Sequence, residues 1–212
     1  LHSTSRRQRQ MCIRDRSELN KTMQAQIKKK DTYKMGIDTL FNLRRQLMQT
    51  LVSFKEDLCR EDFNAIPFIN ADGYHSKTIA YSIWHIFRIE DIVAHTVITE
   101  DEQVFFTGNY QVRINSPIIT TGNELVKQQI ADFSKQLNLE ELYSYIFEVR
   151  ESTEKILERF SYDELKWKIP DERKGYLKSL NVVNCDEKAI WLIDYWCSNC
   201  LLYTSPSPRD TR

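Results

Sequence analysis

The segment SIWHIFRIED, residues 82 to 91, brings several groups that could do chemistry into an otherwise apolar run. His85 offers an imidazole, Arg88 a guanidinium, and Glu90 and Asp91 offer carboxylates. Imidazoles and carboxylates are common ligands of divalent metals, and they also serve as general acids and bases. On an ordinary helix the same groups would form a polar patch, so the position of each group around its helix decides between the two interpretations.

A long helix is predicted from Ser76, as its N-cap, to about Ile98. With about 100° of rotation per residue, its apolar side chains form one stripe that faces the core. This stripe consists of Ile79, Ile83, Ile86, Val93 and Val97. The helix is therefore expected to bury one side and to leave the opposite side polar.

The ionisable groups take different positions around this helix. Glu90 falls inside the apolar stripe, so it should pair with a cation, bind a metal or be protonated. His85 lies at the shoulder of the stripe, where a bundle helix faces its neighbour, whereas Arg88 and Asp91 point away. The simpler alternatives are that His85 is an ordinary core histidine and that Glu90 forms an internal ion pair, with Arg88 or with another helix.

Two further histidines give weaker signals for a site. His75 precedes the predicted helix and His95 lies near its end, and both are expected at the surface. The sequence contains no glycine-rich phosphate loop, nucleophile elbow or zinc-finger spacing. NTP hydrolysis and acyl transfer by a serine therefore have no support from sequence motifs.

Helical periodicity extends over most of the chain and predicts an all-α protein. The long helices are expected over Met35 to Leu58, Ser76 to Ile98, Leu139 to Phe160, and Lys188 to Ser198 with Asp186 as its cap. A short helix is expected over Asn123 to Lys135, an extended crossover over residues 99–122, and irregular structure over residues 161–186. Four long helices with long connections favour a four-helix bundle.

Both ends of the chain read as translated sequencing adapter. Opposite strands of one transposon end used in DNA sequencing would encode Met11 to Asp15 and Cys200 to Asp210. We therefore expect residues 1–16 and 199–212 to be non-native. Residues 17–198 are expected to form one bundle domain whose last helix is truncated.

Charge and cysteine content then exclude several classes of protein. The two ends carry seven basic and two acidic residues out of 30 of each, so the rest has a formal charge of −5. A mildly acidic domain without an apolar run of roughly 20 residues predicts neither a nucleic-acid partner nor a membrane span. Cys59, Cys185 and Cys197 show no CxxC spacing, which indicates reduced thiols in the cytoplasm.

The residues around His85 resemble a known family. The run from Thr78 to Ile83 that leads into WHIFRIED is similar to the second helix of the DinB-like family. This family shares a superfamily with the mycothiol-dependent maleylpyruvate isomerase and with bacterial YfiT-type proteins that are expected to be hydrolases. The similarity covers residues 17–198 in helix order and loop placement, and WHIxRIED is its specific part. It implies a four-helix bundle of the up-up-down-down type.

The resemblance also implies a metal centre. The histidine of the family's second helix is the first of three metal ligands, and it corresponds to His85. The other two ligands are typically an HxxxH pair on the fourth helix, where this chain has Asp194 and Ser198. Asp194 is therefore the candidate oxygen ligand, and the third position has no histidine.

The function that follows from such a centre is metal-dependent. Three protein ligands on Zn²⁺ or Ni²⁺ leave a coordination position open, and the ion lowers the pKa of a bound water or thiol to about 7. The resemblance thus implies a thiol transferase or hydrolase acting on a small-molecule or thiol substrate. Two alternatives remain, a DinB-like binding or stress-response module without metal and a structural bundle that forms a homodimer.

Overall fold

The computed structural model describes residues 16–66, 77–166, 169–183 and 189–203. Every regular element in this part of the chain is helical, and it contains no strand. The prediction of an all-α protein is therefore confirmed. No helix among the described residues is both long enough and apolar enough to cross a membrane.

The chain divides into two compact units. The first comprises Leu1–Asp57 with Phe160–Lys166, and the second comprises Leu58–Arg159 with Trp167–Arg212. The His85 region and all helices from α3 onward, except η4, belong to the second unit.

The first unit is built on one long helix. Its elements are a helix over residues 16–27, η1 (Lys30–Thr32), α2 (Tyr33–Asp57) and η4 (Glu164–Lys166). The Tyr33 hydroxyl donates to the Phe160 carbonyl at 2.9 Å, and the Tyr162 hydroxyl donates to the Lys28 carbonyl at 3.1 Å. These two hydrogen bonds fasten the segment over residues 160–166 to the start of α2.

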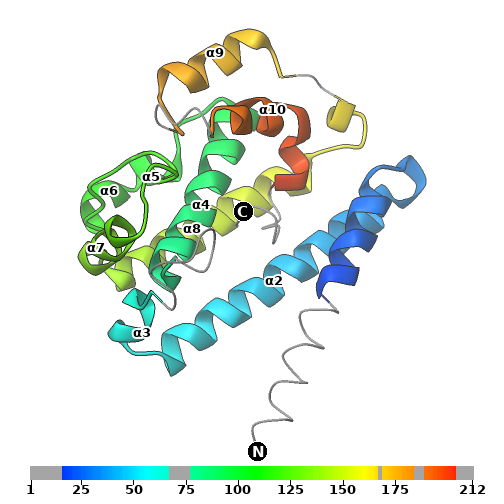
Figure 1. The fold of residues 1–212 in the computed structure, drawn as a ribbon. Coiled ribbons are helices and arrows are strands. Elements are labelled where there is room, and N and C mark those ends of the chain that lie inside the picture. The colour runs from blue at the N-terminus through cyan, green and yellow to red at the C-terminus, as the bar shows by residue number, and fades with distance from the viewer. Residues whose placement is uncertain (1–15, 67–76, 167–168, 184–188, 204–212) are drawn as a thin grey trace, which may run out of the picture. The chain divides into compact units, whose positions relative to one another are not determined.

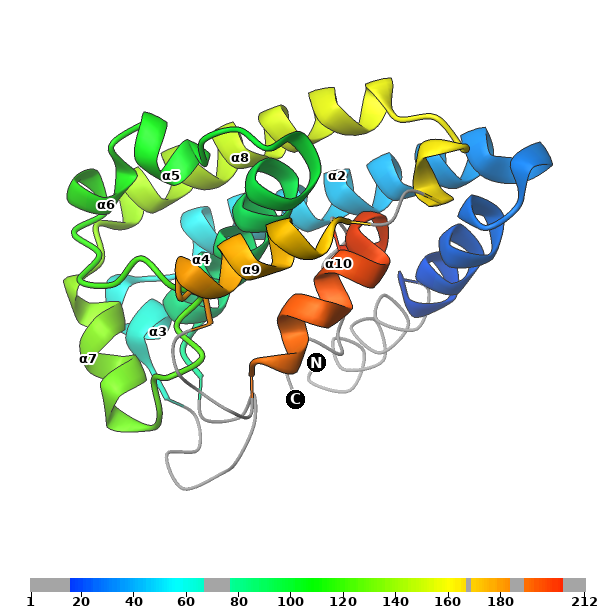
Figure 2. The same cartoon turned by 90° about the horizontal axis from the view of Figure 1, so that it is seen from above.

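The second unit is built around α4 and α8. Its elements are α3 (Arg60–Asn64), α4 (Ile79–Asp91), the π-helix η3 (Ile92–Thr99), α5 (Val104–Thr107), α6 (Tyr110–Arg113), α7 (Gln128–Gln136), α8 (Leu139–Arg159), α9 (Asp171–Ser179) and α10 (Trp191–Tyr203). α4 packs against α8, and α10 packs against η3 and α9 (Figure 1). The view from above shows α5 and α6 lying along α8 (Figure 2).

α4 is the element that carries the candidate site. It begins at Thr78, whose hydroxyl oxygen accepts from the backbone N–H of Tyr81 at 3.1 Å. The predicted cap, Ser76, lies outside the described residues. Almost every side chain of α4 is buried, on both sides of the helix. The predicted stripe was therefore partly misplaced, because Ile83 is buried as expected while Ile79 and Ile86 are only partly buried.

The helix departs from α geometry immediately after Asp91. Ile92–Thr99 forms a π-helix, in which each turn contains more residues than an α-turn, and Glu100 ends it in the left-handed conformation with φ of 59°. A rotation of about 100° per residue no longer applies along this stretch. Positions assigned to residues beyond Asp91 on an α-helical wheel are consequently displaced around the axis.

Two segments predicted to be irregular contain helices. α5 and α6 lie within residues 99–122, and α9 lies within residues 161–186. A helix of one to three turns shows too little periodicity to be recognised, and it depends on tertiary contacts for its stability. For α5 the contact is clear, because Asp91 of α4 accepts from the backbone N–H groups of Val104 and Phe105, each at 2.9 Å.

The bounds of the remaining helices agree more closely with those predicted from the sequence. α2 and α8 match the predicted long helices to within a few residues, and α7 matches the short one approximately. The last helix spans Trp191–Tyr203 and extends beyond Ser198, while its predicted cap Asp186 lies outside the described residues.

Candidate functional site

His85 lies within the buried surface of α4, with 4% of the residue exposed. Its Nδ1 is 2.5 Å from the carbonyl oxygen of Thr121, so Nδ1 carries the proton and donates it. The lone pair of the ring is then on Nε2, to which no described residue makes a hydrogen bond. The ring of Tyr81 stacks on the imidazole with 5.4 Å between centroids.

The charge state of His85 follows from its surroundings. Burial lowers the pKa of His85, the nearby Lys77 ammonium lowers it further, and the hydrogen bond to Thr121 opposes them, which together bring it to about 4. His85 is therefore neutral at pH 7. A neutral imidazole that donates Nδ1–H to a backbone carbonyl and keeps Nε2 free has the orientation of a metal-binding histidine or of a general base.

A loop that follows α6 in the chain fixes the orientation of the His85 ring. The carbonyl of Thr121 accepts from His85, and the carbonyl of Gly122 accepts from the Tyr81 hydroxyl at 2.9 Å. Gly122 has φ of +77°, and a Cβ atom there would lie 2.7 Å from the ring of Trp84. On its other side the loop is held by the Thr121 N–H, which donates to the Val182 carbonyl at 2.8 Å.

Arg88 and Asp91 do not point into solvent as predicted. Arg88 is 1% exposed and Asp91 is completely buried. Arg88 donates to Asp91 at 3.1 Å, to Gln103 at 2.8 Å and to the Ile119 carbonyl at 2.7 Å. Asp91 also accepts from the Tyr145 hydroxyl at 2.8 Å. The second side of α4 is buried because α5, α8 and the part of the α6–α7 loop around Ile119 cover it.

The Arg88–Asp91 pair of α4 also joins α4 to α5 and α8, through the bonds of Asp91 to the start of α5 and to Tyr145 of α8. Burial raises the pKa of Tyr145 well above its usual value, and the Asp91 carboxylate raises it further. Arg88 also lies 4.1 Å from the ring centroid of Phe105. Arg88 is thus engaged with Asp91, Gln103 and the Ile119 carbonyl. Glu90 itself is 2% exposed, in agreement with its predicted place inside the apolar stripe.

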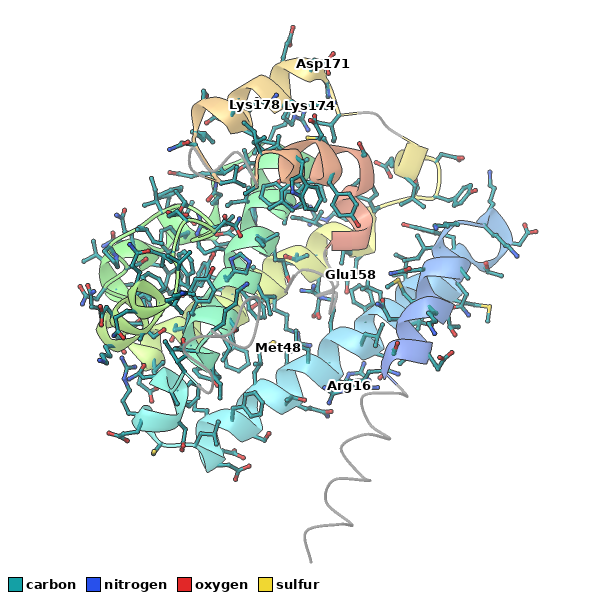
Figure 3. All side chains as sticks on the ribbon, viewed as in Figure 1. Arg16, Met48, Glu158, Asp171, Lys174 and Lys178 are labelled. Carbon is teal, nitrogen blue, oxygen red and sulfur yellow. The ribbon has the colours of Figure 1, made fainter. Side chains whose placement is uncertain are left out.

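Asp194, the candidate oxygen ligand, lies on α10 with 63% of its side chain exposed. Its Oδ1 is 3.7 Å from the Nζ of Lys174 on α9, which also pairs with Asp171 at 3.5 Å (Figure 3). Among the described residues, no hydrogen bond or ion pair joins Asp194 to His85. The neighbouring position at the family spacing, Ser198, donates its hydroxyl to the Asp194 backbone carbonyl at 2.7 Å.

A three-ligand metal centre needs two further donors beside His85. The part of the chain that the structure describes contains no group of three His, Cys, Asp or Glu residues that could hold a metal ion. His85 has the ring orientation of a ligand, and Asp194 is engaged with Lys174. The described donor set therefore does not complete the three-ligand centre that the resemblance implies.

The sequence did not single out Glu124. One carboxylate oxygen accepts from the Thr120 hydroxyl at 2.6 Å, and the other is buried without a hydrogen-bond partner among the described residues. Burial raises the pKa of Tyr81 well above its usual value, and the Glu124 carboxylate raises it further. Glu124 is thus close to the ring that stacks on His85. Glu124 falls at the start of the helix expected over Asn123 to Lys135, whereas in the structure it lies in the loop before α7.

His95 was predicted at the surface and is buried, with 6% of the residue exposed. Both of its ring nitrogens have hydrogen-bond partners in the structure, Asp101 and Ser152. The prediction was wrong because α8 and α10 both pack against η3, and every residue from Ile92 to Ile98 is buried. His75 lies outside the described residues.

No protein-family model matches this chain, and no match was found among curated proteins. The resemblance of WHIFRIED to the DinB-like family therefore stays a prediction. The His85 region itself presents a neutral, oriented imidazole that stacks on Tyr81 and lies near Lys77.

Proposed function

We propose that this chain is a DinB-like protein that binds Zn²⁺ or Ni²⁺ through His85 and acts as a thiol transferase or hydrolase on a small molecule. The observation that carries the proposal is the orientation of His85. Its Nδ1–H is donated to the Thr121 carbonyl at 2.5 Å, and its Nε2 keeps a lone pair. Since a pKa of about 4 keeps the ring neutral, no proton competes for Nε2 at pH 7.

The proposed arrangement of the long helices is the up-up-down-down bundle of that family. The lengths and order of these helices and the packing of α4 on α8 support it. We also propose a cytoplasmic location, supported by Cys59 and Cys197, which are free thiols.

One imidazole is a weak chelator, so the affinity of this chain for a divalent metal should be low. Isothermal titration with ZnCl₂ and with NiCl₂ tests this in a Cys59→Ser background. That background matters because Cys59 is exposed and its Sγ lies 3.1 Å from Asp62, which could bind metal adventitiously. We expect weak binding of one ion, and we expect His85→Ala to abolish it.

Two further variants identify the remaining donors. If Asp194 is a ligand, Asp194→Asn should weaken binding, and if the nearby carboxylate takes that role, Glu124→Gln should do so instead. Binding that survives in His85→Ala would remove His85 from the site.

The alternative is a DinB-like binding or stress-response module without metal, and the lack of a three-ligand group among the described residues favours it. Absence of heat from either metal at millimolar concentration, with the protein folded, would select this alternative.

A further inference from the structure

A second constellation lies away from His85, at the junction of η3 and α8. His95 Nδ1 is 2.6 Å from Asp101 Oδ1, and His95 Nε2 is 3.0 Å from Ser152 Oγ. Asp101 follows His95 by six residues, whereas Ser152 is 57 residues away, and the fold brings Ser152 to them because η3 packs against α8. A hydroxyl, an imidazole and a carboxylate in this order are the parts of a nucleophile activated by a base.

The carboxylate determines which nitrogen of His95 is protonated. A carboxylate oxygen accepts, so Nδ1 carries the proton and donates it to Asp101. In the neutral ring Nε2 is then the acceptor for the Ser152 hydroxyl. Asp101 is itself positioned, because its carboxylate accepts from the Thr99 hydroxyl and its N–H donates to the His95 carbonyl at 3.1 Å.

The end of the π-helix brings the Asp101 carboxylate next to the His95 ring. Glu100 ends η3 in a left-handed conformation, which turns the chain back so that Asp101 lies beside His95. π-Helices are rare and occur frequently at functional sites.

Ser152 behaves differently from other serines in the helices of this chain. Ser82, Ser144 and Ser198 donate their hydroxyls to the backbone carbonyl four residues earlier. The hydroxyl of Ser152 is instead paired with His95. The Ser152 hydroxyl therefore donates its hydrogen bond to the imidazole of His95.

The His95–Ser152 pair opens onto a cavity of about 680 Å³ between the α5 region and α8. This size is in the range of small-molecule sites, and the cavity is open to solvent. Its charged lining consists of Glu102, Glu148, Glu151 and Lys155. Lys155 Nζ pairs with Glu151 at 2.7 Å, and Glu148 accepts from the Tyr110 hydroxyl at 2.6 Å. Carboxylates outnumber ammonium groups in this lining, which disfavours anionic ligands.

We propose that Ser152, His95 and Asp101 form a hydrolytic site for small uncharged or cationic carboxylic esters. Ser152 Oγ attacks the ester carbonyl carbon while its proton passes to His95 Nε2. The tetrahedral intermediate then breaks its bond to the alcohol oxygen, and the alcohol leaves with the proton from Nε2. Water attacks the acyl-serine through the same base, which releases the carboxylic acid and restores Ser152. Lys155, one turn after Ser152 on α8, lines the same cavity.

Covalent labelling of the full chain with diisopropyl fluorophosphate tests the nucleophile directly. The reagent forms a bond between Ser152 Oγ and phosphorus, and fluoride leaves. Tandem mass spectrometry should find the label on Ser152. Ser144 is the internal control, because it lines the same cavity and donates its hydroxyl to the Glu140 carbonyl instead of to a histidine. This measurement needs no variant to fold.

Hydrolysis of 4-nitrophenyl acetate tests the whole site. Ser152→Ala and His95→Gln should each lower the rate above background by about 10²-fold, whereas Ser179→Ala on α9 should leave it unchanged. Asp101→Asn should lower this rate by a smaller factor, because 56% of the Asp101 side chain is exposed. EDTA should have no effect, which separates this site from the metal-dependent proposal. Absence of label on Ser152 in the folded protein, or an undiminished rate in folded Ser152→Ala, would overturn the proposal.

Discussion

Two neighbours act on opposite ends of the His85 ring. The Thr121 carbonyl accepts a hydrogen bond from Nδ1–H, and burial together with the Lys77 ammonium disfavours a second proton on Nε2. The first interaction fixes the orientation of the ring, and the second keeps Nε2 as a free lone pair. Both are needed if Nε2 is to bind a metal or accept a proton from a substrate.

The low pKa of His85 predicts how stability depends on pH when metal is removed with EDTA. The unfolded chain takes up a proton as the pH falls through about 6.5, whereas folded His85 does so only near pH 4. The stabilisation is therefore complete above pH 6.5 and is lost as the pH falls to about 4. The loss should be roughly 3 kcal/mol in the free energy of unfolding.

Urea unfolding at several pH values, compared between the wild type and His85→Asn, measures this contribution. Subtracting the two profiles removes the titration of carboxylates elsewhere in the chain. The difference should decline between pH 6.5 and 4. Parallel profiles across this range would show that His85 does not titrate abnormally.

At the scale of elements, the short loop around Gly122 holds the candidate site on α4. Gly122 combines a φ of +77° with a close approach to Trp84, so a side chain is excluded there for two reasons. Gly175 is a useful contrast, because it lies in α9 and a Cβ atom added there would have no neighbour within 4 Å.

The two glycines should respond to alanine with opposite signs. Gly122→Ala should destabilise the protein by roughly 1–3 kcal/mol, because it adds strain at positive φ and a clash with Trp84. Gly175→Ala should stabilise it by up to about 1 kcal/mol, since alanine favours a helix. Urea denaturation measures both changes. Equal effects of the two substitutions would mean that the loop does not pack on Trp84 as described.

Sequence periodicity predicted the elements that are long enough to repeat their pattern. α2, α8 and the continuous stretch of α4 with η3 were located to within a few residues, and Glu90 was correctly placed on a buried side. The predicted positions of side chains were wrong where the assumption of a single buried helix face fails. A wheel that treats α4 as having one buried side left Arg88 and Asp91 in solvent, although α5 and α8 cover them.

The second constellation could not be predicted from sequence spacing. His95, Asp101 and Ser152 have no motif spacing, and their meeting depends on a π-helix that no apolar pattern indicates. His85 was found because it interrupts an apolar run. The carbonyl of Thr121, which fixes the proton on Nδ1, belongs to a loop without periodicity and therefore gave no signal.

For the molecule as a whole, the central claim is that the fold holds a neutral His85 with a free Nε2 available to a metal. Long-range ¹H–¹⁵N NMR spectra of the histidine rings at pH 7, recorded before and after addition of Zn²⁺, test this claim in one sample. We expect Nδ1 of His85 to be protonated, Nε2 to be unprotonated, and the Nε2 resonance to shift when zinc is added. A proton on Nε2, or a ring whose resonances do not change with excess zinc, would contradict the claim.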